Sequence, residues 1–418
     1  MINIMKGTKD LLPQESYKWD MIEREIREVA RLFNLRKIAT PTFEHTELFL
    51  RGVGDTTDIV NKEMYTFEDK GGRSVTLKPE GTAGVVRSYI ENGLSQLPQP
   101  LKMYYETPVF RYERPQAGRL REHHQFGVEI YGADTPQQDV EVMMIARTLF
   151  ARLGVPMPAL HINSIGCPTC RKGYNEALRS YFASREEDLC PTCRERLEKN
   201  ALRILDCKEE KCAEIAAGAP SVLDYLCEDC RAHHEGVKAL LTKAGIEYSV
   251  DDKIVRGLDY YTKTVFEFVV ENIGAKSTVC GGGRYNNLVE QIGGKPCPAV
   301  GFGMGIERLV LLMTSVGASF GEIPSPDLFV ANIGAADEAF LLVASLRVQG
   351  INAECDTMGR SLKSQMKLSD KLAAKYTVVL GETEIAEGEV KVKRMSDGSE
   401  ESVLIADLAK YINESKRD

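Results

Sequence analysis

The sequence predicts an α+β fold: an antiparallel sheet, a helical insertion that interrupts it, and a separate α/β unit at the C-terminal end. Three observations predict this arrangement. Two long strand-like segments, 103–112 and 125–131, flank a charged loop. A cysteine-rich stretch, 167–234, separates them from later strand-like segments. Residues 327–418 alternate between strand and helix patterns, which is typical of a compact α/β unit.

The size and composition of the chain predict a globular protein with more than one domain. With 418 residues, of which 43% are hydrophobic and 27% charged, it is long for a single hydrophobic core. No run of eighteen apolar residues and no apolar signal region occur, so we expect a cytoplasmic protein. The net charge of −8 gives no general attraction to nucleic acid, and an RNA partner must be held by local basic patches.

The first part of the chain predicts a helix, two strands and a second helix. Apolar residues at helical spacing predict an amphipathic helix over 16–34, which Thr40-Pro41-Thr42 separates from a following strand. Residues 73–77 predict another strand, and the segment KPEGTAGVVRSYI turns from it into a helix. Glu80, Gly81 and Thr82 fall where this helix begins, a position at which a carboxylate favours the helix dipole.

The segments 103–112 and 125–131 predict a long antiparallel hairpin, because apolar and polar residues alternate along the second segment. Its connecting loop holds more charge than a hairpin that only packs against a core requires. The charged residues between the strands are Arg111, Glu113, Arg114, Arg119, Arg121 and Glu122. Arginines on a sheet suit a polyanion such as ATP or the end of a nucleic acid. A solvated hairpin whose charges pair with one another is the alternative.

The cysteine-rich stretch predicts an inserted, mostly helical domain over 168–248. Eight of the eleven cysteines crowd here, which favours reduced thiols or a metal over a disulfide framework. Two CPTC sequences have the spacing of a structural tetrahedral zinc site, in which each pair of thiolates supplies two ligands. The candidate ligands are Cys167, Cys170, Cys190 and Cys193. Spacing does not reveal which pairs combine, and reduced core thiols are the alternative.

The remaining segments predict strands, a bend and a basic helix. We expect strands over 251–268 and a bend at Gly281-Gly282-Gly283. Glycines at 301, 303 and 305 share one side of a strand, where the missing side chains leave room for a flat ring. The second helix of the C-terminal unit is expected to carry a basic stripe, with a solvated surface as the alternative. The stripe consists of Lys363, Lys367, Lys371 and Lys375.

Several of these segments together resemble a known family. FRYERPQAGRLREHHQFGVEIYG resembles motif 2 of class II aminoacyl-tRNA synthetases, and AVGFGMGIERL, at 299–309, resembles motif 3. The block KGTKDLLP near the N-terminus also resembles this family, and RKIATPTFEHTELFLRGVG resembles its motif 1. RGLDYYTKTVFEF, at 256–268, and CGGGRYNNL resemble blocks particular to histidyl enzymes. The resemblance covers essentially the whole chain, which is identified as a member of the histidyl-tRNA synthetase family.

The resemblance implies a domain organisation and a reaction. Residues 1–167 and 249–318 would form the class II catalytic domain, 168–248 the insertion and 327–418 an anticodon-binding domain. Motif 1 implies a homodimer. The implied reaction uses ATP with Mg²⁺ to convert L-histidine to histidyl-adenylate and pyrophosphate, and then transfers histidine to the 3' end of tRNA(His). Synthetases of this kind commonly have an insertion without a metal, so the zinc expectation rests on the cysteine spacing.

The resemblance also implies roles for individual residues. Arg111 and Arg256 would be the catalytic residues at the phosphate, with Arg308 against the nucleotide and Glu113 near adenine. The implied histidine-binding residues are Glu80, Gly81, Thr82, Gln125, Glu129, Tyr260, Tyr261 and Tyr285. Glu129 and Tyr261 would pair with the imidazole nitrogens, because a site built on hydrogen bonds penalises an analogue that leaves them unpaired. Lys363, Lys367 and Lys371 would contact tRNA phosphates.

Three other functions fit parts of the sequence. A non-catalytic paralogue that senses histidine would typically lack the arginine of RGLDYY and the C-terminal domain, and both are present. A prolyl or threonyl enzyme is disfavoured by RGLDYYTKTVFEF and CGGGRYNNL. An RNA-binding module without catalysis is excluded only if the arginines and Glu80 converge in space.

Overall fold

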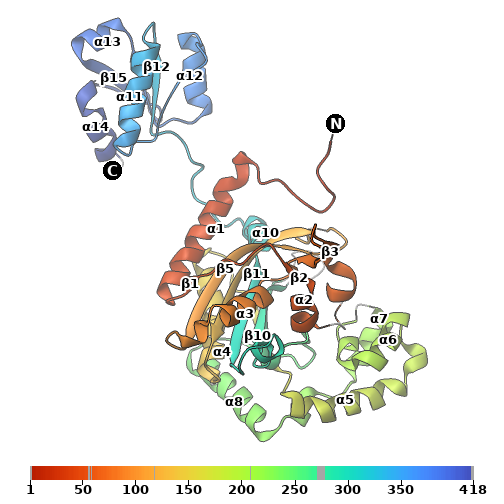
Figure 1. Ribbon diagram of the computed structural model, residues 1–418. Coiled ribbons are helices and arrows are strands. Elements are labelled where there is room, and N and C mark those ends of the chain that lie inside the picture. Colours follow the sequence, from red (N-terminus) through yellow and green to blue (C-terminus); the bar gives the residue numbers. More distant parts are fainter. Residues whose placement is uncertain are drawn as a thin grey trace. The chain divides into compact units, whose positions relative to one another are not determined.

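An eight-stranded sheet forms the centre of the N-terminal part of the computed structural model (Figure 1). The structure describes residues 2–54, 57, 59–116, 118–207, 209–270 and 278–415. They divide into two compact units, Met1–Gly321 and Glu322–Asp418. The strand order is β1-β5-β6-β11-β10-β9-β7-β8. The strands are β1 (Arg36–Lys37), β5 (Leu101–Phe110), β6 (Glu122–Tyr131), β7 (Ala159–Ser164), β8 (Ser249–Val250), β9 (Thr262–Val269), β10 (Thr278–Arg284) and β11 (Ala299–Gly305).

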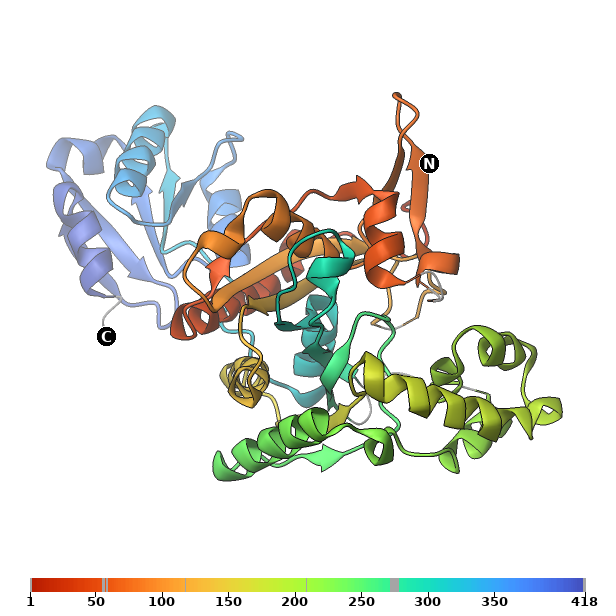
Figure 2. The same ribbon diagram turned by 60° about the horizontal axis from the view of Figure 1, so that its bottom comes forward.

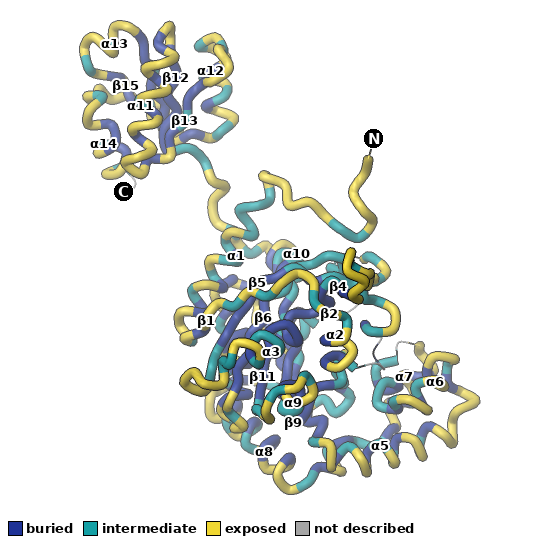
Figure 3. The backbone as a smooth tube through the Cα atoms, in the orientation of Figure 1, coloured by how far each residue is buried: buried dark blue, intermediate teal, exposed yellow. Residues whose placement is uncertain are grey.

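All strand pairs of this sheet are antiparallel except β1 with β5 and β7 with β8 at its two edges. The predicted hairpin is confirmed as β5 and β6, which pair from Leu101 opposite Tyr131 to Phe110 opposite Glu122. Along β6 the side chains alternate as predicted, since Phe126, Val128 and Ile130 enter the main core. Figure 3 shows the central strands of the sheet as largely buried.

Helices pack against both faces of the sheet. Helices α1 (Pro13–Leu32), α4 (Pro136–Arg152), α8 (Glu228–Lys243) and α10 (Ile306–Val316) pack against one another or the sheet. Their apolar faces build the main core with the strands. Helices α2 (Thr46–Val53), α3 (Thr82–Glu91) and α9 (Leu288–Gln291) contact one another. A small sheet in the order β2-β4-β3 lies beside α2; its strands are β2 (Phe43–His45), β3 (Tyr65–Glu68) and β4 (Ser74–Leu77).

The predicted insertion is helical, as its charged sequence indicated. Between β7 and β8 lie α5 (Pro168–Ala183), α6 (Pro191–Lys199), α7 (Glu210–Ala217) and α8. Short helical turns occur at η3 (Glu186–Asp188), η4 (Ala201–Ile204) and η5 (Val222–Tyr225), and outside the insertion at η1 (Ile59–Glu63) and η2 (Leu94–Gln96). Figure 2 shows α5, α6 and α7 gathered at one edge of the unit. They have a hydrophobic core of their own, to which the cysteines contribute.

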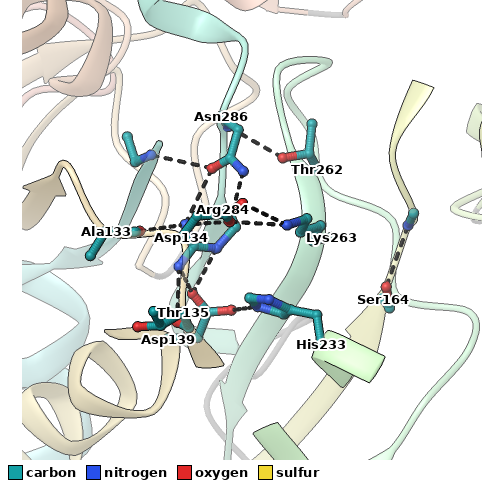
Figure 4. A network of polar contacts seen from close by, with 12 residues as sticks. Ala133, Asp134, Thr135, Asp139, Ser164, His233, Thr262, Lys263, Arg284 and Asn286 are labelled. Atoms are coloured by element: carbon teal, nitrogen blue, oxygen red, sulfur yellow. Dashed lines mark hydrogen bonds and ion pairs between the residues drawn. The ribbon is translucent and has the colours of Figure 1, made fainter. Parts of the chain in front are cut away.

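A buried ionic network joins the insertion to the sheet (Figure 4). The Arg284 guanidinium on β10 donates to Asp139 on α4 and, at 2.8 Å, to the carbonyl of Ala133. Asp139 also contacts Nε2 of His233 on α8 at 2.6 Å. Burial raises the pKa of the Asp139 carboxyl, but the hydrogen bond with His233 and the charge of Arg284 outweigh it, and the net shift is downward. The network therefore fixes α8 against the eight-stranded sheet through the contact of His233 with the Asp139–Arg284 ion pair.

The C-terminal unit is an α/β domain with a five-stranded sheet in the order β13-β12-β14-β15-β16. The predicted alternation is confirmed from β12 (Leu328–Asn332) through α11 (Ala336–Val348), β13 (Ala353–Cys355) and α12 (Leu362–Lys371) to β14 (Tyr376–Leu380). The remaining elements, which the sequence analysis did not resolve, are α13 (Glu382–Glu387), β15 (Glu389–Arg394), β16 (Glu400–Leu404), η6 (Ile405–Asp407) and α14 (Leu408–Glu414). Among the described residues, no helix has the length and apolar character needed to cross a membrane.

Three local expectations were wrong. The segment 251–261 contains no strand; it is a loop, held by a hydrogen bond of 3.2 Å from the Asn163 side chain to the carbonyl of Ile254. Gly281, Gly282 and Gly283 do not form a bend but lie within β10. A Cβ at Gly282 would stand 2.2 Å from the carbonyl oxygen of Gly301, so the glycine serves close strand packing.

The third error concerns the end of the basic helix. Helix α12 ends at Lys371, because Ala373 adopts a left-handed conformation with φ of 51° and turns the chain into β14. Lys375 is therefore not part of the stripe; its Nζ lies 3.4 Å from Oδ1 of Asp327. Lys363, Lys367 and Lys371 are exposed on the helix.

Candidate active site

A cavity of about 430 Å³ lies over the face of the sheet that carries Gln125. Its walls come from α3, the β5–β6 hairpin, the 251–261 loop, β10 and the junction of β11 with α10. Nine of the residues selected from the sequence line it: Glu80, Thr82, Arg111, Glu113, Gln125, Arg256, Tyr260, Tyr261 and Arg308. Segments far apart in the chain thus converge on one cavity.

Beneath this cavity Glu129 collects hydrogen bonds from three side chains. Thr82 Oγ1 donates to it at 2.7 Å and the Tyr105 hydroxyl at 3.1 Å, and the Tyr285 hydroxyl donates to its second oxygen. Glu129 is only 1% exposed. Burial raises the pKa of this carboxyl to about 8. Burial thus disfavours the charged form of Glu129, and the hydrogen bonds from Tyr285, Thr82 and Tyr105 offset part of that cost.

Glu80 is fixed at the first turn of α3. Its carboxylate accepts hydrogen bonds from the backbone N–H groups of Thr82 at 2.8 Å and Ala83 at 2.7 Å. The Tyr260 hydroxyl donates to the same carboxylate at 3.5 Å. Burial raises the pKa of Glu80. Glu80 thus caps the first turn of the helix, as one of the two alternatives weighed from the sequence predicted, and it also lines the cavity. Gly81 donates its N–H to Gln125 Oε1 at 3.2 Å and so orients that amide.

Three arginines face the same cavity from different elements. Arg111 follows β5, and its Nε donates to the carbonyl of Pro79 at 2.8 Å. Arg308, at the start of α10, donates from Nε to the carbonyl of Gly118 at 3.2 Å and from Nη1 to that of Thr278. Burial lowers the pKa of Arg308. These contacts hold two guanidinium groups at the cavity by hydrogen bonds to backbone carbonyls.

Arg256 reaches the cavity from the 251–261 loop. It pairs with Glu267 on β9, whose second oxygen accepts a hydrogen bond from Thr278 Oγ1 at 2.8 Å. Burial lowers the pKa of Arg256, but the Glu267 carboxylate outweighs it, so the net pKa shift is upward. Its buried Nε has no hydrogen-bond partner within the described chain. A buried donor of this kind is expected to meet an acceptor on a bound ligand.

Glycines give these side chains their room. A Cβ on Gly281 would stand 2.4 Å from Arg256 Nη2, so this glycine allows the guanidinium to cross the strand. Cβ atoms on Gly301 and Gly303 would stand 2.1 Å from Glu129 Oε2 and 2.3 Å from Gln125 Nε2. At Gly301 and Gly303 the missing side chains therefore leave room for Glu129 and Gln125; that the pattern also leaves room for a flat ring stays a prediction.

The sequence analysis missed several residues that support the site. Tyr105 lies on the same face of β5 as Met103 and reaches both Glu129 and Gln125. Glu267 pairs with Arg256. Strand alternation would have placed Tyr105 on this face once the hairpin register was known. Nothing local in the sequence identifies the partner of Arg256.

The cysteines form two groups of four, and the predicted ligand set was wrong. Sγ atoms of the first cluster lie within 4.8 Å of one another, and so do those of the second. The first cluster is Cys167, Cys170, Cys227 and Cys230, and the second is Cys190, Cys193, Cys207 and Cys212. Each CPTC pair thus lies next to a later pair of cysteines and not next to the other CPTC. The two CPTC sequences begin different helices, α5 and α6, and the whole length of α5 lies between them. All eight are free thiols.

Comparisons with known proteins agree with the site. The chain matches the family model described as histidyl-tRNA synthetase over residues 7–309 and that described as anticodon binding domain over residues 327–415. A histidine–tRNA ligase of Acetivibrio thermocellus is 56% identical, covering 96% of this chain and 97% of that protein. One from Caldanaerobacter subterraneus subsp. tengcongensis is 54% identical, covering 97% and 98%.

A solved structure agrees as well. The crystal structure of the apo histidyl-tRNA synthetase of S. aureus superposes with a TM-score of 0.84 at 41% identity, covering 99% of this chain and all of that one. The resemblance seen in the sequence is therefore confirmed across both units. The chain belongs to the histidyl-tRNA synthetase family.

Proposed function

We propose that this protein activates L-histidine with ATP to histidyl-adenylate and pyrophosphate, and then transfers histidine to the 3' end of tRNA(His). The observation that carries this assignment is the convergence of Arg111, Arg256 and Arg308 on one cavity. Thr82 lines the same cavity and donates a hydrogen bond to the buried carboxyl of Glu129 beneath it. A cation-rich half suits a triphosphate, and a polar, hydrogen-bonding half suits an imidazole.

The arginines act on the phosphate. The histidine carboxylate attacks the α-phosphorus of ATP, and negative charge builds up on the α-phosphate oxygens as pyrophosphate leaves. Arg111 holds the α-phosphate, Arg256 bridges it and the histidine carboxylate, and Arg308 packs against the nucleotide. The buried Nε of Arg256 supports this role, because a phosphate or carboxylate oxygen satisfies it. ATP enters as its Mg²⁺ complex, and Glu113 contacts the adenine region.

Histidine is selected by the polar half of the cavity. Glu129 and Tyr261 pair with the imidazole nitrogens, and Tyr260 and Tyr285 line the ring. An imidazole N–H that donates to Glu129 favours its carboxylate form and reduces the desolvation cost. Glu80 and Thr82 receive the α-amino group, which as a cation requires fixed acceptor oxygens. Gly81 and Gln125 orient the substrate carboxylate or amino region.

The other parts of the chain take the roles expected of the family. We assign residues 1–167 and 249–318 to the catalytic domain, 168–248 to the insertion and 327–418 to anticodon binding. Lys363, Lys367 and Lys371 contact tRNA phosphates. The protein acts in the cytoplasm as a homodimer. The insertion holds structural zinc, since eight free thiols gathered in two groups of four match the donor set of that metal.

ATP–pyrophosphate exchange tests the activation step. Purified protein is offered each of the twenty amino acids separately with MgATP. Exchange with histidine alone supports both the reaction and the specificity. Exchange with proline or threonine instead would assign the chain to another amino acid. Binding of histidine without any exchange would identify a histidine-sensing paralogue. Aminoacylation of tRNA(His) transcript then measures the second step.

A further inference from the structure

The second cysteine cluster has the geometry of a closed metal site. In a tetrahedral zinc–thiolate site the ligand sulfurs lie about 3.8 Å apart, given a Zn–S distance of about 2.3 Å. Cys190 Sγ and Cys207 Sγ are 3.9 Å apart. The backbone N–H of Cys190 donates to Cys212 Sγ at 3.2 Å. Such hydrogen bonds stabilise a thiolate ligand.

The first cluster has the same geometry. Cys167 Sγ lies 3.6 Å from Cys170 Sγ and 4.0 Å from Cys227 Sγ. The N–H of Cys227 donates to Cys170 Sγ at 3.1 Å. This cluster joins the beginning of α5, where the chain enters the insertion, to the beginning of α8, the helix that leads back to the sheet. Two independent tetrathiolate sites therefore fit the insertion.

The second cluster closes a loop that reaches the active site. Cys193 and Cys207 bracket residues 194–206, which contain the end of α6 and η4. The N–H of Cys207 donates to the carbonyl of Ile204 at 3.1 Å, so the ligand directly follows the η4 turn. Arg196 Nη1 donates to the carbonyl of Arg203 at 3.1 Å and fixes η4 against α6. An ion bound by all four thiolates would order this loop by closing it.

Arg203 in this loop holds the segment that carries Arg256. Its Nη1 donates to the backbone carbonyl of Arg256 at 2.9 Å, and its Nη2 pairs with Asp259 Oδ1 at 2.8 Å. The Arg203 side chain is only 12% exposed, so both contacts are shielded from water. One guanidinium thus spans the first and fourth residues of the RGLD turn. Asp206, in the same loop, lines the active-site cavity.

We propose that zinc bound by Cys190, Cys193, Cys207 and Cys212 fixes Arg203 as a positioning residue for Arg256, so that the insertion sets the geometry of histidine activation. The role rests on the proposed function, in which Arg256 acts on the reacting groups. Arg203 itself touches neither substrate; it acts by holding the backbone of Arg256. The first cluster serves as a separate metal site that stabilises the fold of the insertion and does not act on Arg203 or Arg256.

Metal content tests the two sites directly. Elemental analysis after chelator washing is expected to give two zinc ions per chain in the unaltered protein. Cys207→Ser/Cys212→Ser and Cys227→Ser/Cys230→Ser should each retain one, and Cys355→Ser, in the C-terminal unit, should retain two. Cobalt substitution should give thiolate-to-metal charge-transfer bands that halve in either double variant. Fewer than two ions in the unaltered protein would overturn the two-site assignment.

Exchange kinetics test the coupling. Arg203→Ala should keep both ions and leave the KM for ATP little changed. Its kcat for histidine-dependent exchange should fall about tenfold or more, because displacing a catalytic group by about 1 Å lowers the rate by at least this factor. Arg203→Lys should restore part of the rate. Arg185→Ala is the matched control, since that guanidinium donates to the carbonyl of Tyr181 within α5.

A double-mutant cycle separates coupling from general damage. If the second cluster acts through Arg203, adding Arg203→Ala to Cys207→Ser/Cys212→Ser should lower kcat little further. Fully additive losses, or normal exchange in a Cys207→Ser/Cys212→Ser variant that has lost its ion, would overturn the inference. Absence of exchange in the unaltered protein with two ions bound would instead count against the proposed reaction.

Discussion

The Arg284 guanidinium and the Asp139 carboxylate pair through two nitrogens with neither side chain exposed to solvent, and Nε of Arg284 lies 2.9 Å from Oδ1 of Asp139. His233, on the last helix of the insertion, contacts the other carboxylate oxygen. A fully buried ion pair contributes little net stability, but loss of one partner leaves an uncompensated charge in a medium of low dielectric constant.

Arg284→Met is therefore expected to lower the free energy of unfolding by about 3 to 5 kcal/mol. Adding Asp139→Asn should recover part of this loss, because it removes the stranded charge. Chemical denaturation followed by circular dichroism measures both variants. Equal stability of the single and double variants would show that the cost comes from packing and not from charge.

Arg256→Ala should slow ATP–pyrophosphate exchange about a hundredfold, which corresponds to about 3 kcal/mol of transition-state stabilisation. The charge of Glu267 is then unpaired beside the phosphate and adds to the loss. Arg256→Ala/Glu267→Gln removes that repulsion and should be somewhat faster than the single variant. Near-normal exchange by Arg256→Ala would remove this residue from the mechanism.

Gly281→Ala and Gly282→Ala form a matched pair on β10. The new Cβ at 281 meets only the flexible end of Arg256, so activity should fall about tenfold or more while the free energy of unfolding changes by less than about 1 kcal/mol. The Cβ at 282 meets backbone and should destabilise by about 2 kcal/mol or more. Thermal unfolding and exchange assays on both variants distinguish the effects; a stable, fully active Gly281→Ala protein would contradict the packing described.

Glu129 makes stability depend on pH. Its pKa of about 8 in the folded protein lies above the ordinary value of 4.5. Between about pH 4.5 and pH 8 the unfolded chain has therefore already released this proton, whereas the folded protein still retains it. This contribution is therefore fully present below about pH 4.5 and is lost as the pH rises to about 8. Glu129→Gln abolishes the titration.

The free energies of unfolding of Glu129→Gln and of the unaltered protein should be measured at pH 5, 6.5 and 8.5. As the pH rises, the stability of the variant should increase relative to that of the unaltered protein. The total change is expected to be on the order of a few kcal/mol. Glu214→Gln, at an exposed position, is the control. A constant difference between Glu129→Gln and the unaltered protein would refute the pKa shift. Histidine KM should rise in Glu129→Gln, since the variant cannot ionise.

Replacing Lys363, Lys367 and Lys371 by alanine should weaken tRNA binding and leave histidine-dependent exchange unchanged. If each lysine contacts one phosphate, the slope of log affinity against log salt concentration should fall by about 2 to 3. Lys391 and Lys410, exposed elsewhere on the same unit, provide a control double replacement. An unaltered slope in the triple variant would mean that the stripe is an ordinary solvated surface.

The sequence predicted the elements whose pattern is local. The period-two alternation of β6 and the amphipathic pattern of α1 follow from burial on one face, and both are confirmed. The family motifs also selected residues that converge on one cavity, because each motif carries functional side chains at fixed spacing. Glu80 could be placed at a helix start, although its simultaneous contact with Tyr260 could not be foreseen.

What the sequence could not give are relationships between distant segments. Cysteine spacing predicted a tetrathiolate site from the two CPTC pairs, yet the length and direction of α5 decide that each pair joins another partner. The three glycines of β10 predicted a bend, because local propensity carries no information on how closely Arg256 and β11 approach the backbone of β10. Arg203 carried no motif, and only the folded position of η4 brings it to the Arg256 carbonyl.

The pairing of β6 with β11 also sets the order of assembly during synthesis. The two strands pair residue for residue, from Gln125 opposite Gly305 to Tyr131 opposite Ala299. At about 5 to 20 residues per second, the ribosome needs on the order of ten seconds after β6 to deliver β11. The whole insertion emerges in that interval, together with all eight clustered thiols from Cys167 to Cys230. The insertion can therefore fold while β6 still presents an open edge, and the cavity closes only afterwards. If the proposed zinc sites fill in this interval, metal shortage would act on the nascent chain before the cavity has formed.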